Sequence, residues 1–132
     1  MSALARTVPR YFQHGDARGS ITGLLNTGIW REVNLISSDA GVTRGGHFHK
    51  HTEECFIILS GQIRVVLSKR DDSGEWRREE HLFSAGDVFI VPPWVMHTFI
   101  VLEKAQWINL LSVPVDQSKP DFHKYPDEGG HE

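Results

Sequence analysis

The most informative segment of the chain spans residues 41–61 and reads GVTRGGHFHKHTEECFIILSG. In an extended strand, residues i and i+2 project to the same side, so His47 and His49 point together. Glu54 opens the apolar run that follows, and strand phase places it, rather than Glu53, on the face that can reach the same centre. Two imidazoles and one carboxylate suit a divalent transition metal with open positions for substrate.

A second segment, residues 86–97, reads GDVFIVPPWVMH. Its apolar strand is stopped by two prolines, which have no backbone N–H to donate, and His97 stands beyond them as a candidate fourth ligand. An H-x-H pair alone is weak evidence for a metal site, and a single histidine after a proline turn is more often a surface residue. The two segments have to be considered together.

The rest of the chain reads as short strands. β-Branched and aromatic runs of strand length recur between turn residues. These runs lie at residues 20–25, 30–37, 55–59, 63–69, 76–83, 88–91, 98–102 and 106–112. Pairs such as Ser60-Gly61 separate them, and no window shows a long 3.6-residue period. The pattern indicates an all-β sandwich or barrel rather than alternating β/α units.

Length and composition restrict the function classes. The chain has 132 residues, eight His, one Cys and a formal net charge of −3. We expect one domain over residues 1–132, with its core at about 15–113 and a tail at 114–132 that holds little to build a core. One thiol excludes a disulfide framework and favours the reducing cytoplasm. Interspersed charges argue against a nucleic-acid partner, and no segment resembles a signal peptide or a membrane span.

Both segments match, in order and spacing, the two motifs of the cupin superfamily. The first motif, G-x5-H-x-H-x4-E-x6-G, is met without a gap at Gly41, His47, His49, Glu54 and Gly61. The second, G-x5-P-x-G-x2-H-x3-N, is met at Gly86, Pro92 and His97 but has Trp94 for Gly and Val101 for Asn. The resemblance covers about residues 41–101. It implies a single-domain cupin fold, the double-stranded β-helix or jelly-roll barrel, with a divalent metal (Zn, Fe, Mn or Ni) on His47, His49, Glu54 and His97.

Further residues resemble those of cupins that act on nucleotide sugars. Residues 43–50, TRGGHFHK, are similar to the R-G-x-H-x-H-K signature of dTDP-4-keto-6-deoxyglucose 3,4-ketoisomerases and of the cupin domain of capsular-polysaccharide enzymes that epimerise a UDP-4-keto sugar. The dTDP-4-dehydrorhamnose 3,5-epimerases share R-G-x-H. Residues 16–20, DARGS, resemble the D-x-R-G element of these enzymes, and residues 116–125, DQSKPDFHKY, loosely resemble their C-terminal segment.

This resemblance implies an isomerase or epimerase that takes a nucleotide-linked 4-keto-deoxy sugar in surface polysaccharide biosynthesis. The 4-ketone acidifies the C3 proton, and a positioned base can remove it. In the 3,5-epimerases the base is the histidine of R-G-x-H, here His47. One residue cannot easily be both base and metal ligand, so Lys50 or His51 becomes the candidate proton carrier if metal is bound. The 3,4-ketoisomerases have Gln at the position of Glu54, and the resemblance implies that they work without metal. The capsular cupin domain has Glu at this position. The candidate catalytic residues are His47, His49 and Lys50.

Three residues are candidates for holding the substrate. Arg18 and Arg44 offer bidentate, permanently charged contacts to a diphosphate, although structural ion pairs explain them equally well. Trp94 can stack on a base or sugar ring, or serve as an interface residue. His14, His81, His123 and His131 have no partner at ligand spacing and are interpreted as surface residues.

Two other functions remain open at this point. A non-haem metal oxygenase would use the same four ligands around Fe(II), and a non-catalytic cupin would only bind a sugar or a small acid. We also expect a homodimer, because association covers the edge strands of a small β-barrel and two-fold dimers are the commonest closed assembly.

Overall fold

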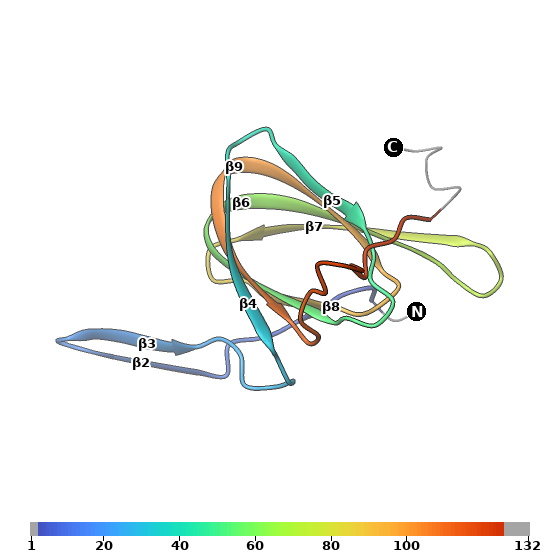
Figure 1. The fold of residues 1–132 in the computed structure, drawn as a ribbon. Helices are drawn as coiled ribbons and strands as arrows, with labels where there is room; N and C mark the ends of the chain where they lie inside the picture. The colour runs from blue at the N-terminus through green and yellow to red at the C-terminus, as the bar shows by residue number, and fades with distance from the viewer. Residues whose placement is uncertain (1–2, 126–132) are drawn as a thin grey trace.

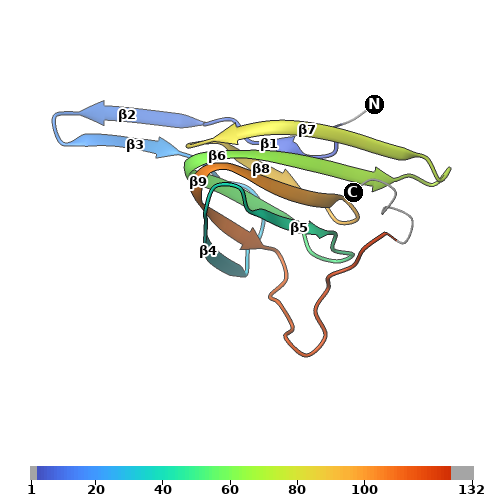
Figure 2. The ribbon, with the colours of Figure 1, turned by 90° about the horizontal axis from the view of Figure 1, so that it is seen from above.

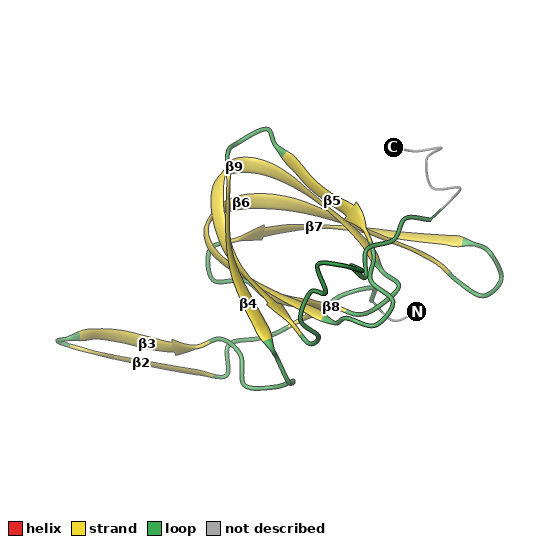
Figure 3. Ribbon diagram, viewed as in Figure 1, coloured by secondary structure: helices red, strands yellow, loops and turns green. Residues whose placement is uncertain are grey.

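Strands account for all the regular structure of the computed structural model, which describes residues 3–125 (Figure 3). They are β1 (Arg6–Thr7), β2 (Phe12–Asp16), β3 (Gly19–Gly23), β4 (Glu32–Ser38), β5 (Thr43–His47), β6 (Glu54–Arg70), β7 (Trp76–Ser84), β8 (Val88–Val91) and β9 (Met96–Leu111). Within that range, no helix is long and apolar enough to cross a membrane. The predicted all-β class is confirmed.

Two long strands, β6 and β9, organise the barrel (Figure 1). They pair with each other in antiparallel register along most of their length. The first half of β6 also pairs with β8 and its second half with β7, while β9 pairs with β5 at its start and β4 at its end. Each long strand therefore contributes to both walls, and the sheet curls into the expected jelly-roll barrel.

The predicted breaks inside these two strands are wrong. The sequence indicated a turn at residues 60–61 and two separate strands at 98–102 and 106–112, but β6 and β9 continue through both places with shifts in register. Gly61 has a φ of +85°, and a Cβ there would lie 2.3 Å from the carbonyl oxygen of Lys104. The glycine thus permits a bulge that bends the strand instead of a turn that reverses the chain.

The interior is apolar and aromatic, and its packing leaves room at one end. Phe56, Phe89, Phe99 and Trp107 are buried in the barrel core, and all of these except Phe89 also line a cavity. Outside the barrel, β2 and β3 form a separate two-stranded sheet that projects away from it (Figures 1 and 2). The core thus supports a site inside the barrel, while the hairpin lies apart.

Candidate functional site: a histidine cluster inside the barrel

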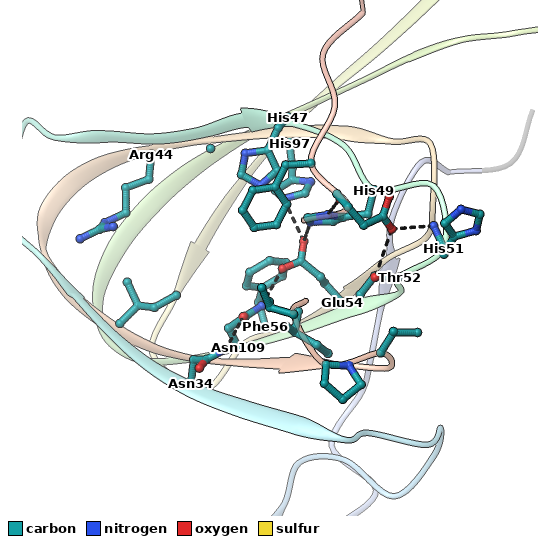
Figure 4. Close-up of a pocket in the computed structure, with 18 of the residues that line it drawn as sticks. Asn34, Arg44, His47, His49, His51, Thr52, Glu54, Phe56, His97 and Asn109 are labelled. Atoms are coloured by element: carbon teal, nitrogen blue, oxygen red, sulfur yellow. Dashed lines mark hydrogen bonds and ion pairs between the residues drawn. The ribbon is translucent and has the colours of Figure 1, made fainter. Parts of the chain in front are cut away.

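A cavity of about 410 Å³ opens into the barrel, which is within the usual size of small-molecule sites. Strands β4, β5, β6 and β9 supply most of its wall, and residues 113–122 line another side (Figure 4). Much of the lining is apolar, so the few polar side chains that enter it determine the chemistry. The histidines of both sequence motifs are among them.

Three imidazoles meet in this cavity. His47 ends β5 and pairs in register with His97 of β9, and His49 follows in the next loop. The ring centroids of His47 and His49 lie 5.1 Å apart, and those of His47 and His97 lie 5.0 Å apart. One ring nitrogen from each histidine lies within 4.8 Å of the other two. Phe48, which lies between His47 and His49 in the sequence, points away from the cluster, as strand alternation predicts. Its ring stacks on Trp94 with centroids 5.3 Å apart.

Glu54 joins the cluster from the first position of β6, where it is 6% exposed. Its Oε1 lies 2.8 Å from Nε2 of His49 and 2.9 Å from Nε2 of His97. Its Oε2 accepts a hydrogen bond from Nδ2 of Asn109 at 2.8 Å. Glu53 does not line the cavity, so the strand-phase argument selected the carboxylate that reaches the histidines.

The cluster divides into a neutral and a charged part. Burial, with His97 and His49 nearby, lowers the pKa of His47 to about 4, so this imidazole is uncharged at neutral pH. Burial would also lower the pKa of His49, but the hydrogen bond and charge of Glu54 outweigh it and raise that pKa. Burial opposes ionisation of Glu54, yet His97 and His49 outweigh it and hold the pKa of that carboxyl well below its usual range.

The C-terminal segment also contributes to the site. Its contacts with the histidines were not predicted from the sequence. The Asp121 carbonyl oxygen lies 2.6 Å from Nδ1 of His49, and its carboxylate accepts hydrogen bonds from the backbone N–H groups of Lys50 and His51. Phe122 stacks on His47 with centroids 4.8 Å apart. The loose resemblance of residues 116–125 to an enzyme C-terminal segment was the only sequence signal for these contacts.

The three predicted substrate residues are separated. Arg44 lines the cavity, and its side chain donates to Ser38 Oγ and to the carbonyl oxygen of Ser37. Arg18 lies on the β2–β3 hairpin, where its side chain is 87% exposed and pairs with Asp16 at 2.6 Å. Trp94 lies outside the cavity and has a φ of 71°.

The remaining predicted residues occupy different surroundings. Lys50 lies outside the cavity with its Nζ 5.4 Å from the Trp94 ring, whereas His51 belongs to the lining. His14 is exposed, and His81 pairs with Glu79. Against the surface interpretation, His123 is half-buried and forms a β-bridge with Phe48. His131 lies outside the described residues.

The donor set fits a divalent metal. Three imidazoles and one carboxylate are the ligand types that zinc and other first-row transition metals take in cupin-like nitrogen and oxygen sites. The contact between Nδ1 of His49 and the Asp121 carbonyl oxygen is the kind of outer hydrogen bond that orients a ligating imidazole. The histidine cluster could therefore hold a metal ion.

Comparison with known proteins places this chain in a family. The model of the polysaccharide biosynthesis C-terminal domain family matches residues 14–121. The chain belongs to this family. Among curated proteins, the UDP-2-acetamido-2,6-beta-L-arabino-hexul-4-ose reductase of Pseudomonas aeruginosa is 35% identical over 51 residues. That match covers 39% of this chain and only 14% of the reductase.

Solved structures show the same fold. A dTDP sugar isomerase from Desulfovibrio desulfuricans G20 has a TM-score of 0.77 and 16% identity, with 96% of this chain and 86% of that chain covered. The rmlC epimerase of Mycobacterium tuberculosis has a TM-score of 0.72 and 20% identity, with 93% of this chain and 68% of the epimerase covered. The QdtA 3,4-ketoisomerase of Thermoanaerobacterium thermosaccharolyticum, in complex with TDP, has a TM-score of 0.71 and 21% identity, covering 96% and 92%. The predicted cupin fold is confirmed.

Proposed function

We propose that this chain is an isomerase or epimerase that removes a proton α to the ketone of a nucleotide-linked 4-keto-deoxy sugar, in surface polysaccharide biosynthesis. The observation that carries the proposal is a neutral imidazole, His47, facing a cavity beside a charged Glu54 network. Its family and the names of the matched relatives, among them epimerases, a ketoisomerase and a hexul-4-ose reductase, support the same substrate class.

In this proposal His47 is the general base. The 4-ketone acidifies the C3 proton, and Nε2 or Nδ1 of the neutral imidazole accepts it. Phe122, stacked on His47, restricts the orientation of the ring. Protonation of C3 from the opposite face by a second group gives epimerisation. Delivery of the proton from His47 to C4, with the C3 hydroxyl proton passing to the C4 oxygen, moves the ketone to C3 and gives isomerisation. Lys50 is a weaker candidate because it lies outside the cavity, and His51 is the alternative carrier on the cavity lining.

A divalent metal is the proposed cofactor of an alternative arrangement, in which His47, His49, Glu54 and His97 would hold the metal and His51 would carry the proton in place of His47. When bound, a metal supplies a Lewis acid that stabilises negative charge on a ketone or enediolate oxygen. If the base is His47, the positive charge of protonated His49, whose ring centroid lies 5.1 Å from that of His47, would stabilise the developing oxygen anion electrostatically. Loss or survival of proton exchange after chelation distinguishes these two arrangements.

The substrate binds, in this proposal, with its diphosphate on Arg44. The guanidinium is held by Ser38 and Ser37 and still faces the cavity, so it is already oriented for phosphate oxygens. Arg18 and Trp94 lie outside this cavity, so their positions do not support contacts to a substrate bound there. A single domain over residues 1–132, a homodimer and a cytoplasmic location stay predictions.

A metal-dependent cupin oxygenase is the second candidate. Its support is the three-histidine, one-carboxylate set, which also suits Fe(II). Oxygen uptake coupled to turnover would favour it over the isomerase. A cupin that only binds its sugar would leave a 4-keto sugar unchanged.

Deuterium exchange at C3 tests the proposed function. UDP- and dTDP-linked 4-keto-6-deoxyhexoses are incubated with the chain in D₂O, with and without chelator, and followed by NMR. We expect exchange at C3, lost on replacing His47. Absence of exchange with every substrate and condition would refute the proposal. Exchange that survives complete metal removal would make the metal structural and retain His47 as base.

A further inference from the structure

The opening of the cavity is marked by residues that line it and are also exposed to solvent. Most of them fall into two groups: Arg44 and Gly45 on β5, and residues 113–116, 119 and 122 after β9. The second group belongs to a C-terminal strap, residues 112–125, which leaves the end of β9, loops away from the barrel and returns beside the end of β5 (Figure 2). The opening therefore lies between β5 and this strap.

The strap is attached to the barrel at two places. Near its start, the backbone N–H of Val115 donates a hydrogen bond to Oε1 of Glu32 on β4 at 2.9 Å. Near its end, the backbone groups of His123 and Phe48 form two hydrogen bonds of 2.9 and 3.0 Å. These attachments leave the residues between them as the part of the strap that can move.

The centre of the strap, residues 116–120, forms a turn that is bonded only to itself. Oδ1 of Asp116 accepts hydrogen bonds from the backbone N–H of Ser118 at 3.0 Å and from its Oγ at 2.7 Å. The carbonyl oxygen of Asp116 accepts another from the backbone N–H of Lys119 at 3.1 Å. Within residues 3–125, no hydrogen bond joins this turn to the barrel. The turn can therefore shift relative to the barrel as one unit without breaking a hydrogen bond to it.

Lys119 is the cation that this turn brings to the cavity. Its amino group has no hydrogen bond or ion pair with any residue that the structure describes. The two carboxylates of the strap that line the cavity are already used, since Asp116 accepts hydrogen bonds within the turn and Asp121 accepts them from backbone N–H groups of the loop after β5. With Arg44 on the β5 side, the opening thus offers one cation from each side to a ligand.

We propose that Lys119 is a substrate-binding residue that contacts the diphosphate from the side opposite Arg44, with residues 116–120 closing over it as a lid. The proposal rests on the proposed function, which places the diphosphate on Arg44. A diphosphate carries negative charge on two adjacent phosphates, so one cation on each side matches it. The guanidinium of Arg44 is held by Ser38 and Ser37, whereas the lysine is a point charge on a flexible stem that can follow the second phosphate.

Closure of this lid leaves the proposed base in place. Phe122, which stacks on His47, lies between Asp121 and His123, and both of these neighbours are hydrogen-bonded to the loop after β5. Movement of residues 116–120 therefore changes the contacts to the diphosphate without turning the His47 ring. Lys119 should accordingly affect the affinity for the nucleotide rather than the proton transfer.

Calorimetric titration with UDP and dTDP tests the contact in the native chain, Lys119→Gln and Lys119→Arg. Lys124→Gln is the matched control, because Lys124 is an exposed lysine of the same strap outside the cavity. We expect Lys119→Gln to weaken binding of the tighter nucleotide about fivefold to tenfold, the effect of one charged contact at an exposed site, and Lys119→Arg to restore it to within about twofold. Lys124→Gln should bind like the native chain.

Three results of this titration would overturn the contact: native-like binding by Lys119→Gln, an equal loss in Lys124→Gln, or no binding of either nucleotide to the native chain. Neither nucleotide carries a ketone, so the affinities are measured whether or not the chain exchanges C3. Exchange at C3 together with native-like binding by Lys119→Gln would refute only this contact. Absence of exchange together with the expected loss of affinity would refute only the proposed function.

Hydrogen–deuterium exchange of the backbone amides of residues 116–119 tests the closure. We expect a saturating concentration of the tighter nucleotide to slow this exchange in the native chain and in Lys124→Gln, and to leave it unchanged in Lys119→Gln. Amides of the turn that exchange equally fast with and without nucleotide in the native chain would refute the lid.

Discussion

Replacing Glu54 by Gln tests the centre of the site most directly. The substitution keeps the shape of the side chain but removes its charge and turns one acceptor oxygen into a donor NH₂ group. In the native protein Oε1 faces His49 and His97 and Oε2 faces Asn109, so both oxygens accept. With the Gln oxygen toward the histidines, its NH₂ group meets the NH₂ group of Asn109. With the amide reversed, the NH₂ group meets Nε2 of His49 and His97, which must then be without a proton. Either orientation costs a hydrogen bond or a change of protonation that the Glu54 carboxylate does not require.

The expected loss is large for a substitution of equal size. A hydrogen bond to a buried charged group contributes about 1.5–3 kcal/mol, and relief from burying the charge offsets part of it, so we expect Glu54→Gln to cost about 2–3 kcal/mol at pH 6. For a chain of this length that lowers Tm by roughly 10 °C. Glu53→Gln, the adjacent residue outside the cavity, is the matched control and should change the free energy of unfolding by less than about 0.5 kcal/mol.

The difference between native protein and Glu54→Gln also depends on pH. The folded-state pKa of Glu54 lies below its ordinary 4.5, so its contribution is present above pH 4.5 and is lost as the pH falls further. The folded-state pKa of His49 is raised above 6.5, so its contribution is present below pH 6.5 and is lost as the pH rises through the raised value. The stability difference should therefore be largest between about pH 4.5 and 6.5.

Urea unfolding of the two variants and the native protein, measured from pH 4 to 9, gives these values. Glu54→Gln as stable as Glu53→Gln at pH 6 would refute the assignment of Glu54 as a buried charged acceptor. A difference that does not change with pH would refute its coupling to His49.

The other predictions concern separate parts of the molecule. His47→Asn should lower C3 exchange by at least about 100-fold with unchanged far-UV circular dichroism, since general-base catalysis contributes that much; equal loss in His14→Asn would contradict the base assignment. Asp121→Asn should cost about 1–3 kcal/mol in urea unfolding, because its carboxylate accepts two backbone N–H groups, whereas exposed Asp72→Asn should be neutral. Burial raises the pKa of Cys55 to about 12, so a thiol reagent should label it only after unfolding; rapid labelling of the native chain would contradict this burial.

Much of the site was predictable because its spacing is local. His47, His49 and Glu54 lie within eight residues, and strand alternation alone determines which of them share a side. His97 was predictable only through the match of the second motif to the cupin superfamily. Asn109, which donates a hydrogen bond to Glu54, carried no comparable signal, since an asparagine late in an apolar run has many structural explanations.

The other contacts of the site could not be predicted because they join residues far apart in the sequence. Asp121 reaches His49 across 72 positions of sequence, and Asn34 reaches Asn109 across 75. Neither spacing has a periodicity that a strand or turn rule can detect. The continuity of β6 at Gly61 was missed for a similar reason, because whether a glycine turns or bulges depends on the strand that packs beside it.

The all-β class, the two motif segments and the residues whose chemistry can move a proton or hold a metal follow from local properties of the chain, namely strand alternation and side-chain type. Which of these residues meet depends on the folded molecule. It brought His97 and Glu54 to the H-x-H pair, placed Asp121 and Phe122 beside it, and left Arg18, Lys50 and Trp94 outside the cavity. Such encounters depend on how β6 and β9 bend and pair, and that is set by packing over the whole barrel rather than by any short stretch of chain.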